Sequence, residues 1–489
     1  MPTQSLPRFI NPTSVSVLLV AVIVLFYGSM LPDGGFSHND EYLTLDRTNS
    51  FTLRDDWWSV YSENRPTFKK PPLQYWMGAL LLETGMDREL ALRLPSFVFA
   101  IGVILLAGLL ARMMLPSNPW VFPVTVLLMA GSKRLWENAM SALLDNGATF
   151  FAMAALLATY AAVRQPRWWY VVALACGLGA LQKAPIPVLI SGVAIVGVAA
   201  TYSWHRLPIG QSLRSRHFVL ALILCFVFVV AWPALQWLIH GSASFREAYL
   251  DQIVERFSPF GEDRGRQPSI YSLLVAREPF LRIPAIIAMF WLPWRLQRME
   301  FIGLPAMFAA YALVALGSSG IVSPRYSLIF LPMLMASLAA MTLTVVPGWR
   351  RQALAVAVLS AVSLGPLKPA SVLDLKPDSQ DKTAALMARV GAALGEDETL
   401  LVCRRNEGGL RLSPGAISYY ASDGRPFYRL RSPDHLVHLQ DSGTIQPPYR
   451  VLCGKSHFAK FGGLMTDVDV VETENGFMHW TAGEVVAGQ

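Results

Sequence analysis

The sequence predicts an all-α polytopic membrane protein that carries a small α/β domain at its C-terminus. Only 15% of the 489 residues are charged and 53% are hydrophobic, with a mean hydropathy of +0.39. Soluble domains carry about 25% charged residues, so this composition favours a chain that crosses a bilayer several times. From about Leu367 onward the composition changes to that of a soluble domain. The sequence therefore divides into a membrane domain, 1–366, and a C-terminal domain, 367–489.

Long apolar windows mark the helices that can cross a bilayer. We count about eleven of them, near residues 14–31, 96–114, 119–133, 146–163, 168–182, 184–202, 217–239, 279–294, 300–317, 324–346 and 352–366. The run from Leu73 to Leu82 is too short to span. We expect it at the membrane interface, with Tyr75 and Trp76 as aromatic anchors.

The charged residues between these windows fall into two kinds of loop. If the N-terminus is cytoplasmic, the cytoplasmic loops carry arginines and almost no acid, whereas the opposite loops carry most aspartates and glutamates. The positive-inside rule predicts this asymmetry. It places the loops 32–95 and 240–278 and the C-terminal domain on the exterior face. It also accounts for the net charge of +7 without nucleic acid, which we do not expect as a partner.

The C-terminal domain has the pattern of a small α/β fold. The residues from Gln380 to Leu394 indicate an amphipathic helix, and Thr399–Cys403 and Arg450–Cys453 indicate short buried strands. Val468 to Trp480 has the pattern of a hairpin.

The four cysteines fall into two pairs. Cys176 and Cys225 lie inside apolar windows, where a free thiol behaves as a small hydrophobic group. Cys403 and Cys453 lie in the C-terminal domain, where a disulfide is permitted if the domain is extracytoplasmic. Two buried thiols are the alternative for this second pair.

Acidic residues gather on the predicted exterior face. Asp40 and Glu41 follow the first apolar window, and Asp145 stands at the exterior end of the window 146–163. Ionisable groups at a membrane face cost free energy, so their presence indicates a function. One carboxylate could act as base on an acceptor hydroxyl or phosphate, and another could stabilise a departing cationic sugar. Capping of a helix N-terminus is the alternative for Asp40 and Asp145.

Basic residues on the same face form a complementary set. A bound phosphate or pyrophosphate would explain them, because lysine and arginine are the usual partners of phosphate oxygens. Contact with lipid headgroups is the alternative for each. Lys70 precedes Pro71-Pro72, which keep the backbone extended. We therefore expect the Lys70 side chain to be held in a defined direction. The candidate phosphate ligands are Lys70, Lys183, Arg256 and Arg325, and Tyr326 stands beside Arg325 at the start of the same span.

The sequence contains no established cofactor motif. We find no Walker loop, no G-x-G-x-x-G at a strand–helix junction, no H-E-x-x-H and no C-x-x-C. His38, beside Asp40 and Glu41, is a candidate ligand for a divalent cation, and a solvated histidine is the alternative. We therefore assign no metal or other cofactor from the residues.

Six short runs occur in an order that is more specific than any single run. They are His38-Asn39-Asp40-Glu41, Lys70-Pro71-Pro72-Leu73-Gln74-Tyr75-Trp76, Arg93-Leu94-Pro95-Ser96, Leu143-Leu144-Asp145-Asn146, Gln182-Lys183-Ala184-Pro185 and Pro324-Arg325-Tyr326-Ser327-Leu328. In this order they resemble the polyprenyl-phosphate-dependent membrane glycosyltransferases of the type C fold. The nearest families are the lipid A aminoarabinose transferases and the bacterial protein O-mannosyltransferase-like enzymes. The resemblance extends to about residue 346.

The resemblance implies an inverting glycosyltransferase in a bacterial inner membrane, with its active site on the periplasmic side. Its donor would be a sugar on a polyprenyl phosphate such as undecaprenyl phosphate, and its acceptor lipid A or lipopolysaccharide, a glycan or a protein. Asp40, with Glu41 beside it, would be the catalytic carboxylate, and Asp145 the second acid of the cavity. The residues that would hold the carrier phosphate are Lys70, Arg256 and Tyr326.

This chain departs from the aminoarabinose transferases at two positions. Lys69 stands where they carry a glutamate, and Arg266 lies in a loop run where they offer a histidine. Both changes remove metal ligands and add positive charge. A divalent cation is therefore not a fixed part of the predicted site, and the sugar or acceptor is expected to be more anionic than in those relatives.

Two other classes of protein fit parts of the pattern. A transporter or flippase for a lipid-linked or anionic solute also places polar residues near a membrane cavity. Transporters usually have two-fold repeats and charged or broken helices near the midplane, which this sequence lacks. A non-catalytic scaffold for envelope assembly, with the C-terminal domain as a docking module, is the third class. The clustering of ionisable residues at one face favours the glycosyltransferase.

Overall fold

The computed structural model describes residues 11–32, 39–62, 65–183, 186–205, 209–246, 279–317, 324–364, 381–403, 417, 421–422, 425, 427–474, 477–483 and 485. The chain forms two compact units. The first unit comprises Met1–Pro32, Phe68–Gln74 and Arg93–Leu375. The second unit comprises Asp33–Thr67, Tyr75–Leu92 and Lys376–Gln489, so it contains the first predicted exterior loop as well as the C-terminal segment.

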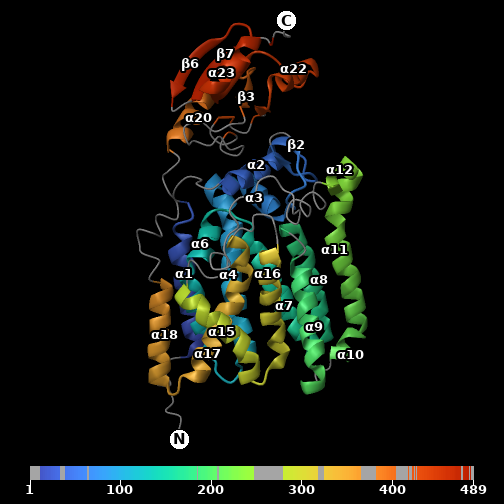
Figure 1. The fold of residues 1–489 in the computed structure, drawn as a ribbon, viewed down its shortest axis with the longest axis vertical. Coiled ribbons are helices and arrows are strands. Elements are labelled where there is room, and N and C mark those ends of the chain that lie inside the picture. The colour runs from blue at the N-terminus through green and yellow to red at the C-terminus, as the bar shows by residue number, and fades with distance from the viewer. Residues whose placement is uncertain are drawn as a thin grey trace. The chain divides into compact units, whose positions relative to one another are not determined.

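The first unit is a bundle of helices (Figure 1). A helix covers the main part of each of the eleven apolar windows. The helices of this unit are α1 (Pro12–Gly28), α4 (Arg88–Met114, from Arg93 on), α5 (Val121–Ala130), α6 (Lys133–Met140), α7 (Asp145–Arg164), η1 (Pro166–Trp168), α8 (Trp169–Gln182), α9 (Ile186–His205), α10 (Ile209–Leu213), α11 (Arg216–His240), α12 (Ser242–Phe245), α15 (Pro279–Arg295), η3 (Met299–Ile302), α16 (Gly303–Gly317), η4 (Pro324–Phe330), α17 (Leu331–Val345) and α18 (Trp349–Leu364).

Four helices of the described residues are long and apolar enough to cross a membrane by length and composition. They are Arg88–Met114, Asp145–Arg164, Arg216–His240 and Tyr326–Val345. Four more apolar helices are shorter, namely Pro12–Gly28, Val121–Ala130, Ile186–Thr201 and Met299–Leu313. The eleven crossings expected from the sequence therefore stay a prediction.

Small residues hold neighbouring helices of the first unit close together. α7 packs against α8 and α9, and α8 packs against α11. Ala155 and Ala158 of α7 share a buried cluster with Ala173 and Cys176 of α8. In lipid, helices associate through close packing of such small residues, because burial of apolar surface gives no preference for protein over lipid tails. Consistent with a lipid-facing side, Phe226 on α11 is 66% exposed.

The second unit contains a mixed sheet of five strands with the order β4-β3-β5-β7-β6. β3 is parallel to both β4 and β5, whereas β7 is antiparallel to β5 and β6. The remaining elements are α2, α3, a two-stranded hairpin and three further α-helices. Their bounds are α2 (Asn39–Arg54), β1 (Tyr61–Ser62), β2 (Arg65–Pro66), α3 (Leu73–Glu83, from Tyr75 on), α20 (Asp381–Ala393), β3 (Thr399–Cys403), β4 (Phe427–Leu430), α22 (Pro433–Asp441), β5 (Tyr449–Gly454), α23 (Lys455–Phe461), η5 (Gly462–Leu464), β6 (Asp469–Glu474) and β7 (Phe477–Ala482).

These elements confirm the helix, the two strands and the hairpin that the C-terminal pattern predicts. Trp480 and Tyr449 lie in the core on one side of the sheet, where they are 0% exposed. Cys403 at the end of β3 and Cys453 in β5 are also buried there. The two cysteines form a disulfide, with their Cα atoms 4.7 Å apart.

One expectation for this unit is wrong. Tyr75 was expected at the membrane interface, but it is 0% exposed. Its hydroxyl accepts a hydrogen bond from Arg47 Nη1 at 2.9 Å, which satisfies the polar end of the side chain inside the unit. The neighbouring Trp76 donates its indole N–H to the carbonyl oxygen of Trp57 at 2.9 Å.

Candidate active site

Asp145 begins α7 and is buried at the end of a short connection from α6. The connection runs from Ser141 to Leu144, and Asp145 is only 7% exposed. A helix N-terminus carries partial positive charge, which favours a carboxylate in the first turn. The cap residue itself is Leu144, which has no side-chain oxygen to accept the first N–H groups of the helix. The carboxylate of Asp145 is instead bound by a lysine.

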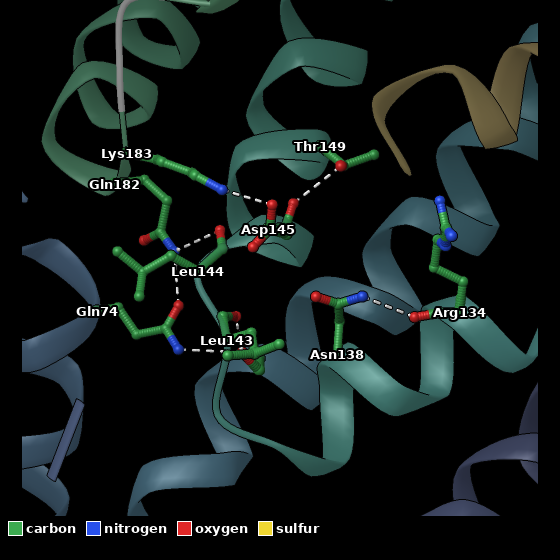
Figure 2. A network of polar contacts seen from close by, with 10 residues as sticks. Gln74, Arg134, Asn138, Leu143, Leu144, Asp145, Thr149, Gln182 and Lys183 are labelled. Carbon is green, nitrogen blue, oxygen red and sulfur yellow. Dashed lines mark hydrogen bonds and ion pairs between the residues drawn. The ribbon is translucent and has the colours of Figure 1, made fainter. Parts of the chain in front are cut away.

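That lysine is Lys183, which follows the last residue of α8. Its Nζ donates to Asp145 Oδ1, and the two side chains are 12% and 9% exposed. Figure 2 shows the two side chains directed at each other. The same Nζ lies 4.8 Å from the ring centroid of Tyr326, within range of a cation–π interaction. Three predicted site residues, from three separate segments, therefore meet within the first unit.

Tyr326 lies in η4, which two buried arginines hold in place. Ser327 Oγ accepts hydrogen bonds from Arg134 Nη1 at 2.8 Å and from Arg282 Nη1 at 3.4 Å. Arg134 is 4% exposed and Arg282 is 2% exposed. A buried guanidinium group is costly unless it is hydrogen-bonded. Ser327 therefore supplies an acceptor that both arginines need. They fix η4 and, with it, the ring of Tyr326.

Lys70 lies in the segment Phe68–Gln74, which belongs to the same unit as Asp145. The ring of Phe68 lies 5.2 Å from the ring of His240, so the segment lies beside the end of α11. At its other end, Gln74 is hydrogen-bonded inside the unit. Lys70 itself is partly exposed. The segment that carries this predicted phosphate ligand is thus held at two points.

Asp40 and Glu41 lie in the first turn of α2, in the second unit. Asp40 is partly exposed, whereas Glu41 is only 1% exposed. Adjacent residues of a helix face different directions, so the two carboxylates have separate surroundings. The predicted convergence of Asp40 with Asp145 and Lys70 involves both units and stays a prediction.

Arg47 is a buried cation on the same helix as Asp40 that the sequence pattern did not bring out. Burial alone would lower the pKa of Arg47, but Tyr75, Asp46 and Asp40 together raise it. Burial also raises the pKa of Tyr75; the charge of Asp40 adds to that rise and the charge of Arg47 opposes it. At neutral pH both groups stay protonated, so a fixed positive charge acts on Asp40.

Three of the predicted residues have no described side chain. Arg256 and His38 lie outside the described residues, and only the backbone of Arg325 is described, within η4. Within the described ranges, no group of three or more His, Cys, Asp or Glu side chains is arranged to hold a metal ion.

The sequence pattern also gave no role to four buried polar residues around Asp145. Each is at most 1% exposed and is a polar residue beside or within an apolar stretch, and three of them lie within four residues of a residue that we had selected. That placement is the signal that could have identified them. The four are Gln74, Ser96, Asn146 and Gln182.

Comparisons with known proteins give a family match and two similar folds. Residues 69–237 match the family described as dolichyl-phosphate-mannose-protein mannosyltransferase. The fold is similar to ArnT from Cupriavidus metallidurans bound to undecaprenyl phosphate, with a TM-score of 0.74 and 14% identity over 98% of this chain and 100% of that one. It is also similar to the oligosaccharyltransferase from Archaeoglobus fulgidus in complex with zinc and sulfate, with a TM-score of 0.53 and 10% identity over 91% of this chain and 68% of that one. No curated protein matches the chain by sequence.

The matched segment contains Lys70, Asp145 and Lys183, and the fold match covers nearly the whole chain. These two findings confirm the predicted resemblance. The chain therefore shares its fold with these membrane glycosyltransferases, and four of its described helices are long and apolar enough to cross a membrane.

Proposed function

We propose that this protein transfers a sugar from a polyprenyl phosphate to an acceptor of the bacterial envelope, on the periplasmic face of the inner membrane. The acceptor is lipid A or lipopolysaccharide, a glycan or a protein. The observation that carries the proposal is the meeting of Asp145, Lys183 and Tyr326 in a chain of this fold. The similar ArnT structure holds undecaprenyl phosphate, which supports a carrier lipid of the same class here.

The cationic side chains suit the phosphate of such a donor. A lysine ammonium has three N–H donors, and Asp145 uses one from Lys183. We assign the others to a phosphate oxygen, and Lys70 belongs to the same unit. We assign Arg256 and Arg325 to the same phosphate from the sequence. Asp145 keeps Lys183 oriented, and its negative charge favours the positive charge that develops on the sugar ring.

Asp40 is proposed as the general base. The acceptor oxygen forms a bond to the anomeric carbon from the face opposite the phosphate, and Asp40 takes the proton of that oxygen. The bond between the anomeric carbon and the phosphate oxygen breaks, and its electron pair stays on the polyprenyl phosphate. The sugar is therefore transferred with inversion. Arg47, on the same helix as Asp40, supplies a positive charge that acts on this carboxylate.

The membrane arrangement belongs to the same proposal. We place the eleven apolar helices across the bilayer and the second unit on the periplasmic side, as the loop charges indicate. The disulfide between Cys403 and Cys453 supports an oxidising compartment for that unit.

The test is a comparison of envelope lipids and glycans by mass spectrometry in cells that produce wild-type protein, Asp40→Ala or no protein. We expect a sugar modification in wild-type cells and a loss of about 100-fold or more in Asp40→Ala, the usual effect of removing a general base. Asp55→Asn is the matched control, because Asp55 is exposed at the other end of the α2 region and has φ 51, which asparagine tolerates.

Purified protein then decides between chemistry and transport. Radiolabelled undecaprenyl phosphate sugars in proteoliposomes should give a labelled covalent product that depends on Asp40. Movement of the labelled lipid across the bilayer without a covalent product would contradict the proposal and favour a flippase. Wild-type turnover in Asp40→Ala would remove the assignment of the base.

A further inference from the structure

Three buried amide side chains each stand close in sequence to a proposed site residue of the first unit. Gln182 precedes Lys183, Asn146 follows Asp145, and Gln74 comes four residues after Lys70. Gln182 and Asn146 are 0% exposed, and Gln74 is 1% exposed. Buried amides destabilise a fold unless they are hydrogen-bonded, so their positions need a reason.

The amides are connected to each other. Gln182 Nε2 donates to Gln74 Oε1 at 2.6 Å, which joins the end of α8 to the start of α3. Gln74 Nε2 in turn donates to Ser96 Oγ at 3.0 Å, on α4. Asn146 Nδ2 donates to the backbone oxygen of Ser96 at 3.3 Å. The side chains thus form one network across four segments.

The network also binds the three backbone carbonyls that precede Asp145. Gln74 Nε2 donates to the oxygen of Ala142 at 2.9 Å, Ser96 Oγ donates to that of Leu143, and Gln182 Nε2 reaches that of Leu144 at 3.3 Å. Figure 2 shows Gln74 and Gln182 beside this connection. Each of the three backbone carbonyls between Ser141 and Asp145 therefore accepts a hydrogen bond from a different side chain.

Two local features show how closely this connection is constrained. Ala142 has φ 49, a left-handed conformation that costs a non-glycine residue about 1–2 kcal/mol. The hydrogen bond from Gln74 helps to hold it there. Gly147 leaves room for Gln182, because a Cβ at that position would lie 2.3 Å from Gln182 Nε2.

We propose that Gln74, Ser96, Asn146 and Gln182 are positioning residues that set the distances between Lys70, Asp145 and Lys183. The inference rests on the proposed function, because it assigns these residues a role in that reaction. A rigid network matters here since the phosphate and the anomeric carbon must be held together, and a displacement of 1 Å can cost about 100-fold in rate. The side chains of the network need not touch the substrate.

The experiment measures kcat/KM with undecaprenyl phosphate sugars for Gln182→Met and Gln74→Met. We expect each to lose about 10- to 100-fold, and the double variant to lose little more, because the residues act as one unit. Gln74→Glu keeps the acceptor for Gln182 but loses the donors to Ser96 and Ala142, so it should fall between wild type and Gln74→Met.

Asn138→Met is the matched control. Asn138 is also a buried amide of the first unit, 3% exposed, but its Nδ2 donates to the oxygen of Arg134 within its own helix α6. Figure 2 shows Asn138 directed toward Arg134, apart from the Gln74–Gln182 pair. We expect its kcat/KM to stay within about two-fold of wild type, which excludes a general effect of removing a buried amide.

A second readout separates positioning from folding. In an Asp145→Asn background, Gln182→Met should change the residual rate by less than about three-fold, since the ion pair that it positions is already broken. An effect as large as in the wild-type background would overturn the inference. If Gln182→Met does not fold, Gly147→Ala displaces the same amide without removing it and should give the same loss.

Carrier binding distinguishes the two proposals. A wild-type protein that binds undecaprenyl phosphate but transfers no sugar would overturn the proposed function. A Gln182→Met protein that binds and transfers like wild type would overturn the positioning role alone. Absence of both binding and transfer in the wild type would overturn both.

Discussion

The ion pair between Asp145 and Lys183 joins two residues that sequence reasoning assigned to different tasks. Asp145 was a candidate for stabilising the sugar, and Lys183 a candidate for binding phosphate. In the structure the lysine neutralises the buried carboxylate and also lies over the ring of Tyr326. An isolated buried carboxylate is costly, so the lysine offsets the cost of burying Asp145 and gains a fixed direction from it.

We expect Lys183→Met to lower the free energy of unfolding by about 3 kcal/mol, because it leaves the Asp145 carboxylate buried without its partner. The double variant Asp145→Leu/Lys183→Met should recover most of that loss, since an apolar pair has no buried charge. Thermal or denaturant unfolding of the detergent-solubilised protein checks both. If the double variant is destabilised by the sum of the losses in Asp145→Leu and Lys183→Met, the broken ion pair is not the cause of the instability.

At the scale of the elements, close contacts between helices shape the first unit. The α8–α11 contact is one example: a Cβ at Gly177 would lie 2.4 Å from Phe228 Cβ. Because a Cβ atom moves only with its backbone, a larger residue there must push the helices apart. α8 ends at Gln182, so its position also determines where Lys183 lies.

We expect Gly177→Ala to destabilise the protein by about 1–3 kcal/mol through this overlap. Gly192→Ala in α9 is the control, because no atom of the described residues lies within 4 Å of a Cβ built there. The control should be neutral or stabilising by up to about 1 kcal/mol, since alanine is the better helix former. Thermal unfolding of both variants measures the difference, and equal shifts would contradict the packing argument.

In the second unit, an ion pair connects the start of β3 with β5. Arg450 Nε and Nη2 donate to the two oxygens of Glu398 at 2.6 and 2.9 Å, a bidentate arrangement. Burial alone would raise the pKa of Glu398, but the hydrogen bonds and charge of Arg450 lower it below its ordinary value of 4.5. The pair therefore stabilises the sheet when Glu398 is ionised.

The sign of the pH effect follows from this lowered pKa. The stabilisation is fully present above pH 4.5, the unfolded value, and is lost as the pH falls through the lower, folded value. We expect hydrogen exchange in β3 and β5 of the whole protein, corrected for intrinsic rates, to become faster below pH 4.5. Glu398→Gln should exchange faster at neutral pH and lose this part of the pH dependence. An unchanged profile in Glu398→Gln would assign the acid sensitivity to other groups.

At the scale of the whole molecule, the cysteines report on the compartment of the second unit. Cys403 and Cys453 are joined, whereas Cys176 and Cys225 of the first unit are free. A disulfide that closes 50 residues of chain contributes about 4 kcal/mol by the chain-entropy estimate. It persists in the periplasm but is reduced in the cytoplasm.

We expect alkylation of the denatured protein without reductant to label two thiols, those of Cys176 and Cys225, and alkylation after reduction to label all four. Peptide mass spectrometry identifies the labelled positions. Labelling of Cys403 or Cys453 before reduction, in protein isolated from membranes under acid quench, would argue against a periplasmic second unit.

Local patterns in the sequence predict the fold class and the positions of the helices. Apolar length, loop charge and strand alternation are local properties, so the eleven windows and the sheet elements around Thr399–Cys403 and Val468–Trp480 could be read from neighbouring residues. The order of the short runs was enough to indicate the family. These patterns also selected Asp145, Lys183 and Tyr326 as site residues, each for its own reason.

Which of these residues meet depends on the three-dimensional packing of the helices. Asp145 and Lys183 are 38 positions apart, and their contact depends on how α7 packs against α8. The same holds for Gln74 and Gln182, which are 108 positions apart. It also holds for Arg47 and Tyr75, which form a buried pair although Tyr75 was expected at the membrane interface. Local propensity carries no information on such distances, because they are set by the packing of whole helices and by the requirement that buried polar groups find partners.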